Sequence, residues 1–119
     1  MSLFTKFLIG IIAAEHLYIM YFEMLAWERI GKRVFKFLPE NLFTPTKGLA
    51  ANQGLYNGFL AAGLLWTFFI TDAIWAKNIA LFFLVCVAVA GIYGAISGTR
   101  KIFFLQALPV LIAIISLMI

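Results

Sequence analysis

Four long apolar stretches separated by polar connectors most constrain the fold of this chain. A helix that crosses a bilayer core of about 30 Å needs roughly 20 mostly apolar residues. The chain is 65% hydrophobic and 12% charged, whereas soluble domains average about 45–50% and about 25%. We therefore expect a lipid bilayer around the protein. Four segments are predicted to span it: residues 3–27, 49–71, 75–97 and 102–119.

The predicted spans are helices, because a bilayer accepts only helices or closed barrels and these runs do not alternate apolar with polar residues. The connectors "TDAI" and "GTRK" are short, so the helices they join should be antiparallel. We predict an all-α polytopic membrane protein, with residues 1–119 forming one domain as an up-down bundle of four transmembrane helices. The first span is too long and too acidic for a cleaved signal peptide and should be retained. Pro109 is expected to kink the last span.

The first connector, residues 28–48, is longer and mixes basic with apolar residues. This pattern predicts an amphipathic segment at the lipid interface. A calmodulin-target helix has a similar pattern and is the less favoured interpretation. Seven of the nine basic residues lie in the first and third connectors, against Lys6 and Lys77 on the other side. The positive-inside rule then predicts a multi-pass protein of the cell membrane, with connectors 28–48 and 98–101 in the cytoplasm and both termini outside.

Membrane topology also accounts for the net charge of +4, so no nucleic-acid partner is expected. The single cysteine, Cys86, excludes an intrachain disulfide and a multi-cysteine metal site. Small residues recur at intervals of four, which lets helix backbones approach closely. Packing within one bundle explains this spacing, and a homo-oligomer interface is the alternative. The two series are Gly54, Gly58 and Ala62, and Ala90, Gly94 and Gly98.

Ionisable side chains within the first span are the strongest functional signal in the sequence. Glu15 falls near its middle and is followed by His16, and Glu23 lies about two turns further on. At about 100° per residue, His16, Glu23 and Trp27 share one stripe, with Glu15 at its edge. An ionisable group in mid-membrane costs several kcal/mol unless it is paired or hydrated, so it indicates a functional site.

The stretch "NQGLYNG" gives the second span a polar stripe of its own. Its polar residues occupy contiguous faces of a helix, whereas Gly54 and Gly58 fall on the other side and are free to pack. Under the predicted topology both stripes lie in the cytoplasmic half of the membrane. We therefore predict a polar cavity between the helices that opens towards the cytoplasm. Its ligand-binding side chains are predicted to be Trp27, Asn52, Gln53, Tyr56, Asn57, Tyr93 and Gln106.

The chemistry of such a cavity is left open by the sequence. Glu23, His16 and Glu15 are candidate catalytic residues, because two carboxylates and a histidine can act as acid and base. The same side chains can bind zinc or iron, but there is one histidine and both carboxylates come from one helix. We therefore expect no metal and no cofactor. The chain has no nucleophile elbow, P-loop or dinucleotide fingerprint, so whether it is an enzyme is undecided.

Three functions agree with these residues. The favoured one is binding, or acting on, a small amphipathic or lipid-like molecule that enters from the inner leaflet. The second is a small proton-coupled exporter that works as an oligomer, with the Glu15 faces meeting across it. In the third, the chain is a structural membrane subunit whose polar groups bond to one another, at about 0.6 kcal/mol for each interhelical hydrogen bond.

Four motifs carry a resemblance to a known family. They are "EHLYIMYFEMLAW" in the first span, "LAANQGLYNGFLAAGLLW" in the second, "VAGIYGA" in the third and "QALPVLIAI" in the fourth. In these motifs and their order, the chain resembles a family of small four-helix integral membrane proteins, the Domain of Unknown Function 1304 family. The resemblance extends nearly from end to end. It implies a membrane protein of about this size, and it implies no activity, ligand or catalytic residue.

Overall fold

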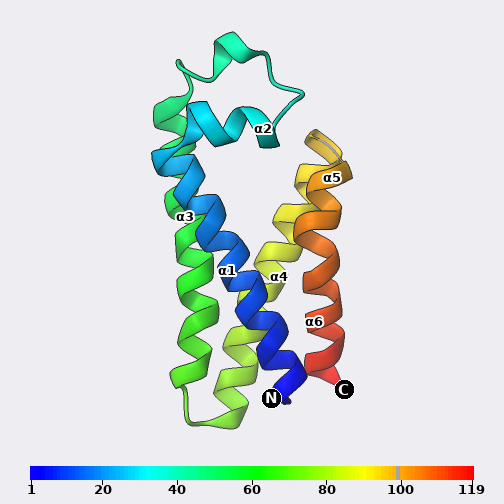
Figure 1. The fold of residues 1–119 in the computed structure, drawn as a ribbon. Coiled ribbons are helices and arrows are strands. Elements are labelled where there is room, and N and C mark those ends of the chain that lie inside the picture. The colour runs from blue at the N-terminus through cyan, green and yellow to red at the C-terminus, as the bar shows by residue number, and fades with distance from the viewer. Residues whose placement is uncertain (99) are drawn as a thin grey trace. The chain divides into compact units, whose positions relative to one another are not determined.

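The structure is a computed structural model that describes residues 1–98 and 100–119, and their side chains except at 102–104. Every regular element in this part of the chain is helical (Figure 1), which confirms the predicted all-α class. Three long helices follow the first three predicted segments to within a few residues, and the fourth predicted segment, 102–119, is divided among shorter elements. In chain order the elements are α1 (Leu3–Leu25), the π turn η1 (Trp27–Gly31), α2 (Lys32–Val34), η2 (Glu40–Leu42), α3 (Lys47–Trp66), η3 (Thr67–Phe69), α4 (Ala73–Ser97), α5 (Arg100–Ile102), η4 (Phe103–Ala107) and α6 (Leu108–Met118).

Two of the described helices are long and apolar enough to cross a membrane. They are α1, with a mean hydropathy of 1.5, and α4, with 2.6. Helix α3 has 20 residues, but its three carboxamides, at Asn52, Gln53 and Asn57, make it more polar than these two. The apolar helix Leu105–Met118 is shorter than a full span. The four-span bundle therefore stays a prediction.

The chain divides into two compact units, which are described separately. The terminal unit consists of Met1–Ala14 and Leu60–Ile119. Asp72 begins α4 by accepting hydrogen bonds from the backbone N–H groups of Ile74 and Trp75, the usual way to satisfy free donors at a helix start. The core of this unit combines apolar side chains from α1, α3, α4 and α6, among them Ile9, Leu64, Leu84, Val87 and Val110.

Close helix packing in the terminal unit occurs at Gly91. A Cβ added there would lie 3.0 Å from the backbone nitrogen of Ala107, so α4 and η4 touch backbone to backbone. Gly91 is one residue away from the predicted small-residue series, of which Ala90 and Gly98 are exposed. Pro109 lies at the start of α6, directly after the π-helical η4. This agrees with a change of helical geometry at the proline, which has no N–H to donate.

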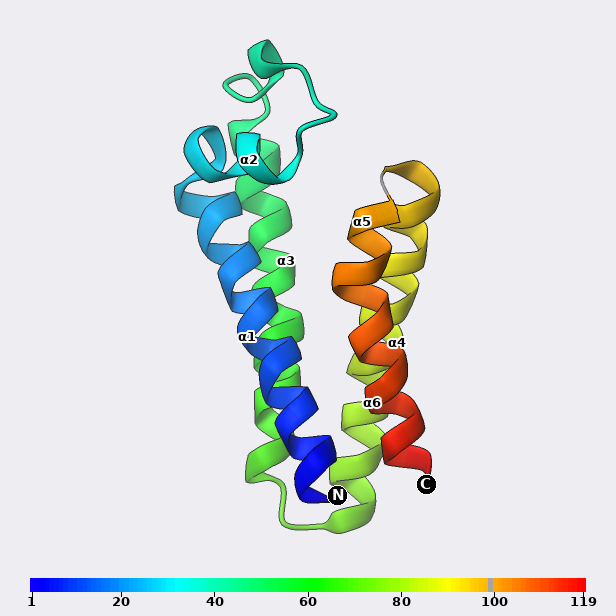
Figure 2. The ribbon, with the colours of Figure 1, turned by 45° about the vertical axis from the view of Figure 1, so that its right-hand side comes forward.

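The middle unit, Glu15–Phe59, contains the end of α1, the first connector and the beginning of α3. Its two helical arms run side by side in both views, and the connector folds over one end of the pair (Figures 1 and 2). The connector is held there by an aromatic and aliphatic core. The buried members of this core are Phe22, Ala26, Trp27, Ile30, Phe43 and Ala50.

Candidate functional site

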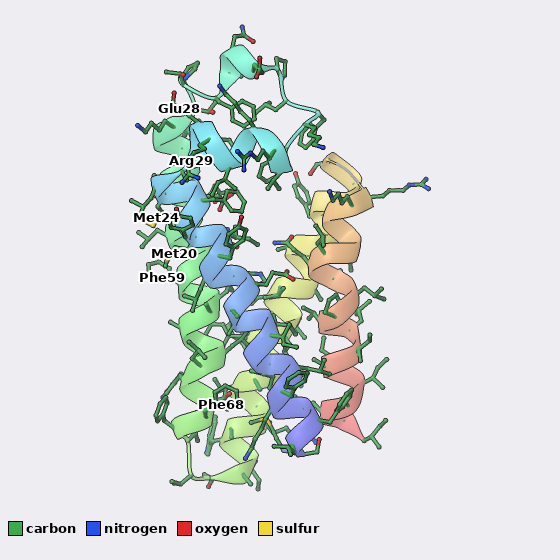
Figure 3. All side chains as sticks on the ribbon, viewed as in Figure 1. Met20, Met24, Glu28, Arg29, Phe59 and Phe68 are labelled. Atoms are coloured by element: carbon green, nitrogen blue, oxygen red, sulfur yellow. The ribbon has the colours of Figure 1, made fainter. Side chains whose placement is uncertain are left out.

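Two glycines let α1 and α3 approach closely in the middle unit. A Cβ added at Gly54 would lie 2.8 Å from Met24 Cγ and 3.1 Å from the carbonyl oxygen of Met20. At Gly58 an added Cβ would lie 2.5 Å from Met20 Sδ. Figure 3 shows Met20 and Met24 on α1 beside α3. The packing face predicted from these glycines is therefore the face of α3 that contacts α1, as small residues in membrane helices allow.

This close approach joins Glu23 of α1 to Asn57 of α3. The Asn57 Nδ2 group donates a hydrogen bond of 2.8 Å to Glu23 Oε1, and it also donates to the backbone carbonyl of Gln53 at 3.1 Å. The Glu23 side chain is buried, with 8% of its surface exposed. Among the described residues, Asn57 is the one hydrogen-bond partner of Glu23, and the one ion pair lies elsewhere, between Lys47 and Glu28.

Trp27 lies one turn beyond Glu23 and is fixed on several sides. Its Nε1 group donates a hydrogen bond of 2.9 Å to Thr46 Oγ1, and Thr46 in turn donates to the Leu42 carbonyl at 2.7 Å. The Trp27 ring centroid is 5.0 Å from that of Phe43. A Cβ added at Gly31 would lie 2.6 Å from the Trp27 ring. The indole is therefore locked in one position against the connector.

A pocket of about 210 Å³ opens between these groups, within the middle unit. Trp27 is the one aromatic residue of its lining, and the remaining surface is mainly aliphatic. Glu23 and Gln53 bring polar groups to it. The lining residues come from α1, the connector and α3: Glu23, Trp27, Leu38, Thr46, Leu49, Ala50 and Gln53.

The structure brings together four of the residues singled out in the sequence. Glu23, Trp27 and Gln53 line the pocket, and Asn57 bonds to Glu23. Asn52 and Tyr56, the other two polar residues of that stretch, are exposed like Gln53 but are not part of the lining. They lie on the side of α3 away from Gly54, because residues two apart on a helix differ by about 200°.

The remaining predicted site residues lie outside the pocket lining. His16 is buried, with 1% of its surface exposed, and Glu15 is half-buried. Tyr93 is exposed and Gln106 half-buried, and both belong to the terminal unit. Within the described residues, no three His, Cys, Asp or Glu side chains gather as a metal-binding group.

The pocket also uses residues that the sequence did not single out. Thr46, Leu38 and Leu49 lie in the connector or at the start of α3, where helical phase gives no guidance. The available signal was Trp27 itself, since a buried indole N–H usually finds an acceptor. Thr46 lies 19 residues away from it, so spacing alone could not identify the partner.

A polar clamp outside the pocket fixes the beginning of α3 to the π turn. Glu28 Oε2 accepts a hydrogen bond of 2.8 Å from the Thr44 hydroxyl, and Lys47 Nζ lies 3.5 Å from Glu28 Oε1. The Thr44 hydrogen bond, helped by Lys47, holds the pKa of the Glu28 carboxyl below its usual range. Arg29 donates to the Tyr21 hydroxyl at 3.2 Å. Figure 3 labels Glu28 and Arg29 in this region.

Comparisons with known proteins cover all of these residues. Residues 10–118 match the model of a family described as "Protein of unknown function (DUF1304)". The chain is also similar to the uncharacterized protein YpaA of Lactococcus lactis subsp. lactis (strain IL1403), with 31% identity over 118 residues and 98% of each chain covered. No solved structure is significantly similar to it. These matches confirm the resemblance inferred from the four motifs, and they name no ligand and no reaction.

Proposed function

Because this chain belongs to the DUF1304 family, whose description gives no activity, we propose a function from its own residues: it binds a small amphipathic or lipid-like molecule in the pocket of the middle unit. The observation that carries the proposal is an open, largely aliphatic pocket whose lining includes one buried glutamate, Glu23. Binding sites for small molecules generally have this composition, an apolar lining with a few polar groups that fix orientation.

The size of the pocket favours an amphipathic ligand. Pockets that enclose a drug-sized molecule measure about 300–1,000 Å³, whereas this one measures about 210 Å³. It therefore has room for one end of a ligand, while the rest extends outside. Leu38, Leu49 and the Trp27 ring contact apolar atoms of the bound end, and Glu23 and Gln53 contact its polar atoms.

We place this pocket in a membrane protein with four spans. The proposal is supported by two helices of sufficient length and hydropathy and by the agreement of α1, α3 and α4 with the first three apolar segments. The excess of basic residues in the first and third connectors favours a cytoplasmic position for both. The ligand then enters from the inner leaflet, close to the first connector.

Native mass spectrometry of the gently extracted protein tests the proposal. We expect a copurified lipid-like molecule in the wild-type spectrum. Leu49→Trp should displace it, because Leu49 lines the pocket and is 72% exposed, so a larger side chain fits without repacking the core. Leu55→Trp is the matched control, at an exposed position of the same helix that is not part of the lining. Equal occupancy in both variants would overturn the proposal.

The hydrogen bond between Glu23 and Asn57 favours one competing function, that of a structural subunit. In that case the bond only fixes α1 against α3, and Asn57→Ala lowers stability without changing ligand occupancy. Under our proposal Asn57→Ala also changes occupancy, because it removes the hydrogen bond that fixes Glu23, a lining residue of the pocket. Parallel measurement of thermal unfolding and bound mass separates the two.

A further inference from the structure

We propose that the molecule bound in this pocket carries a cationic amine head group, and that Glu23 is the residue that binds it. The inference rests on the proposed function and specifies its ligand class. It depends on three observations in the middle unit: the isolation of the Glu23 carboxyl group, the position of the Trp27 ring, and the absence of a competing cation from the lining.

Glu23 is a buried residue without a counter-charge. It is 8% exposed, and within the described part of the chain no basic side chain lies within 4.0 Å of it. Its hydrogen bond with the neutral Asn57 amide uses Oε1, which leaves Oε2 for a ligand. A buried carboxylate is costly unless it is paired and hydrogen-bonded. An ammonium group on the ligand supplies both the charge and the donors.

Trp27 provides a second feature that suits a cation. Trp27 lines the same pocket as Glu23, and its ring is held by Thr46 and Phe43. The face of an indole attracts ammonium groups through its quadrupole, more strongly than other aromatic rings do. A rigid indole beside a carboxylate is therefore suited to an amine, and its remaining surface accepts the adjoining methylene groups.

The lining leaves no other cation to neutralise Glu23. It contains no lysine or arginine, and the nearby Lys47 is paired with Glu28 at 3.5 Å. An anionic head group would be repelled by Glu23. A neutral hydroxyl group would form a hydrogen bond but leave the buried charge uncompensated. The pocket therefore selects an amine over an alcohol, and an alcohol over a carboxylate.

Three amphiphiles with the same tail test this order: octylamine, octanol and octanoate. Each is titrated against the full chain in non-ionic detergent and counted by native mass spectrometry, with free concentrations corrected for partition into empty micelles. Octylamine should bind at least about tenfold more tightly than octanol, as expected for one hydrogen bond to a charged group. Octanoate should bind most weakly of the three.

Two substitutions of the same kind then assign the selectivity. Glu23→Gln should lower the affinity for octylamine to that for octanol and leave octanol unchanged. Glu40→Gln is the matched control, because it removes an exposed carboxylate of the same unit that does not line the pocket, and it should keep the preference for octylamine.

The outcomes separate this inference from the proposed function. Equal affinities for the three probes, or a preference for octanol or octanoate, would overturn the cationic head group and leave pocket binding standing. If none of the probes binds, both are overturned. The comparison in the unmodified chain decides the question even if Glu23→Gln fails to fold.

Discussion

Replacing Gly54 by alanine should separate α1 from α3 and break the hydrogen bond between Glu23 and Asn57. The new Cβ would lie 2.8 Å from Met24 Cγ, 3.0 Å from Glu23 Cβ and 3.1 Å from the Met20 carbonyl oxygen. Comfortable contacts between such atoms need about 3.5–4.0 Å, and two of the three neighbours, a Cβ and a backbone oxygen, move only with α1 itself. The helices must therefore move apart by roughly 0.5–1 Å.

The cost of this movement follows from its parts. Overpacking costs about 1–3 kcal/mol. Losing the 2.8 Å bond between Asn57 and Glu23 adds about 1–3 kcal/mol for the polar groups left unsatisfied. Alanine returns about 1 kcal/mol through its higher helix propensity. The net loss of stability is on the order of 1–5 kcal/mol.

Thermal unfolding followed by circular dichroism measures this loss, and Gly48→Ala is the matched control. Gly48 lies in the first turn of the same helix, and an added Cβ there meets nothing within 4 Å. We expect Gly48→Ala to be neutral or slightly stabilising. Equal melting temperatures for the two variants would show that the close approach at Gly54 does not hold α1 against α3, and the reasoning would be refuted.

Three further predictions concern the connector. Thr46→Val should cost about 1–3 kcal/mol, because it leaves the buried Trp27 N–H without its acceptor; unchanged thermal unfolding would contradict this. Because the pKa of Glu28 is lowered, its hydrogen bond with Thr44 stabilises the docked connector fully at pH values above the ordinary glutamate pKa, about 4.3. This stabilisation is lost as the pH falls through the lowered pKa. Amide exchange at residues 44–47 should therefore quicken in acid, and Glu28→Gln should abolish that pH dependence. Finally, four basic residues of the connector should attract anionic lipid, since each contributes about 1 kcal/mol at an anionic surface; they are Arg29, Lys32, Arg33 and Lys36. Replacing all four by glutamine should lower the retention of phosphatidylglycerol relative to phosphatidylcholine in nanodiscs. Unchanged lipid selectivity would exclude an interfacial role for the connector.

Much of the fold could be predicted because it depends on local patterns. Apolar run lengths predicted the positions of α1, α3 and α4 to within a few residues. Four-residue spacing also predicted that Gly54 and Gly58 face a neighbouring helix. The three carboxamides of α3 make its assignment as a span harder. The polar groups that indicate a site also lower the hydropathy by which spans are recognised.

The site itself was only partly predictable. Helical phase placed Glu23 and Trp27 on one stripe, and both line the pocket. Phase cannot say which edge of a polar face meets the neighbouring helix. It could not separate Gln53, which lines the pocket, and Asn57, which bonds to Glu23, from Asn52 and Tyr56, which do neither. Nor could it find the bond from Trp27 to Thr46, because the connector between them returns by irregular turns rather than by a helical repeat.

The indole of Trp27 belongs to two structures at once. Trp27 lines the pocket, while its N–H group holds the returning connector through Thr46. Any molecule that binds against the ring in this position therefore also favours the docked connector, and thermodynamic reciprocity requires the docked connector to favour the molecule by the same factor. A lipid surface that orders the connector would raise the affinity of the pocket for its ligand without contacting the pocket. Protease protection of residues 28–46 would then rise with occupancy of the pocket, and occupancy of the pocket would rise when the connector lies on a lipid surface.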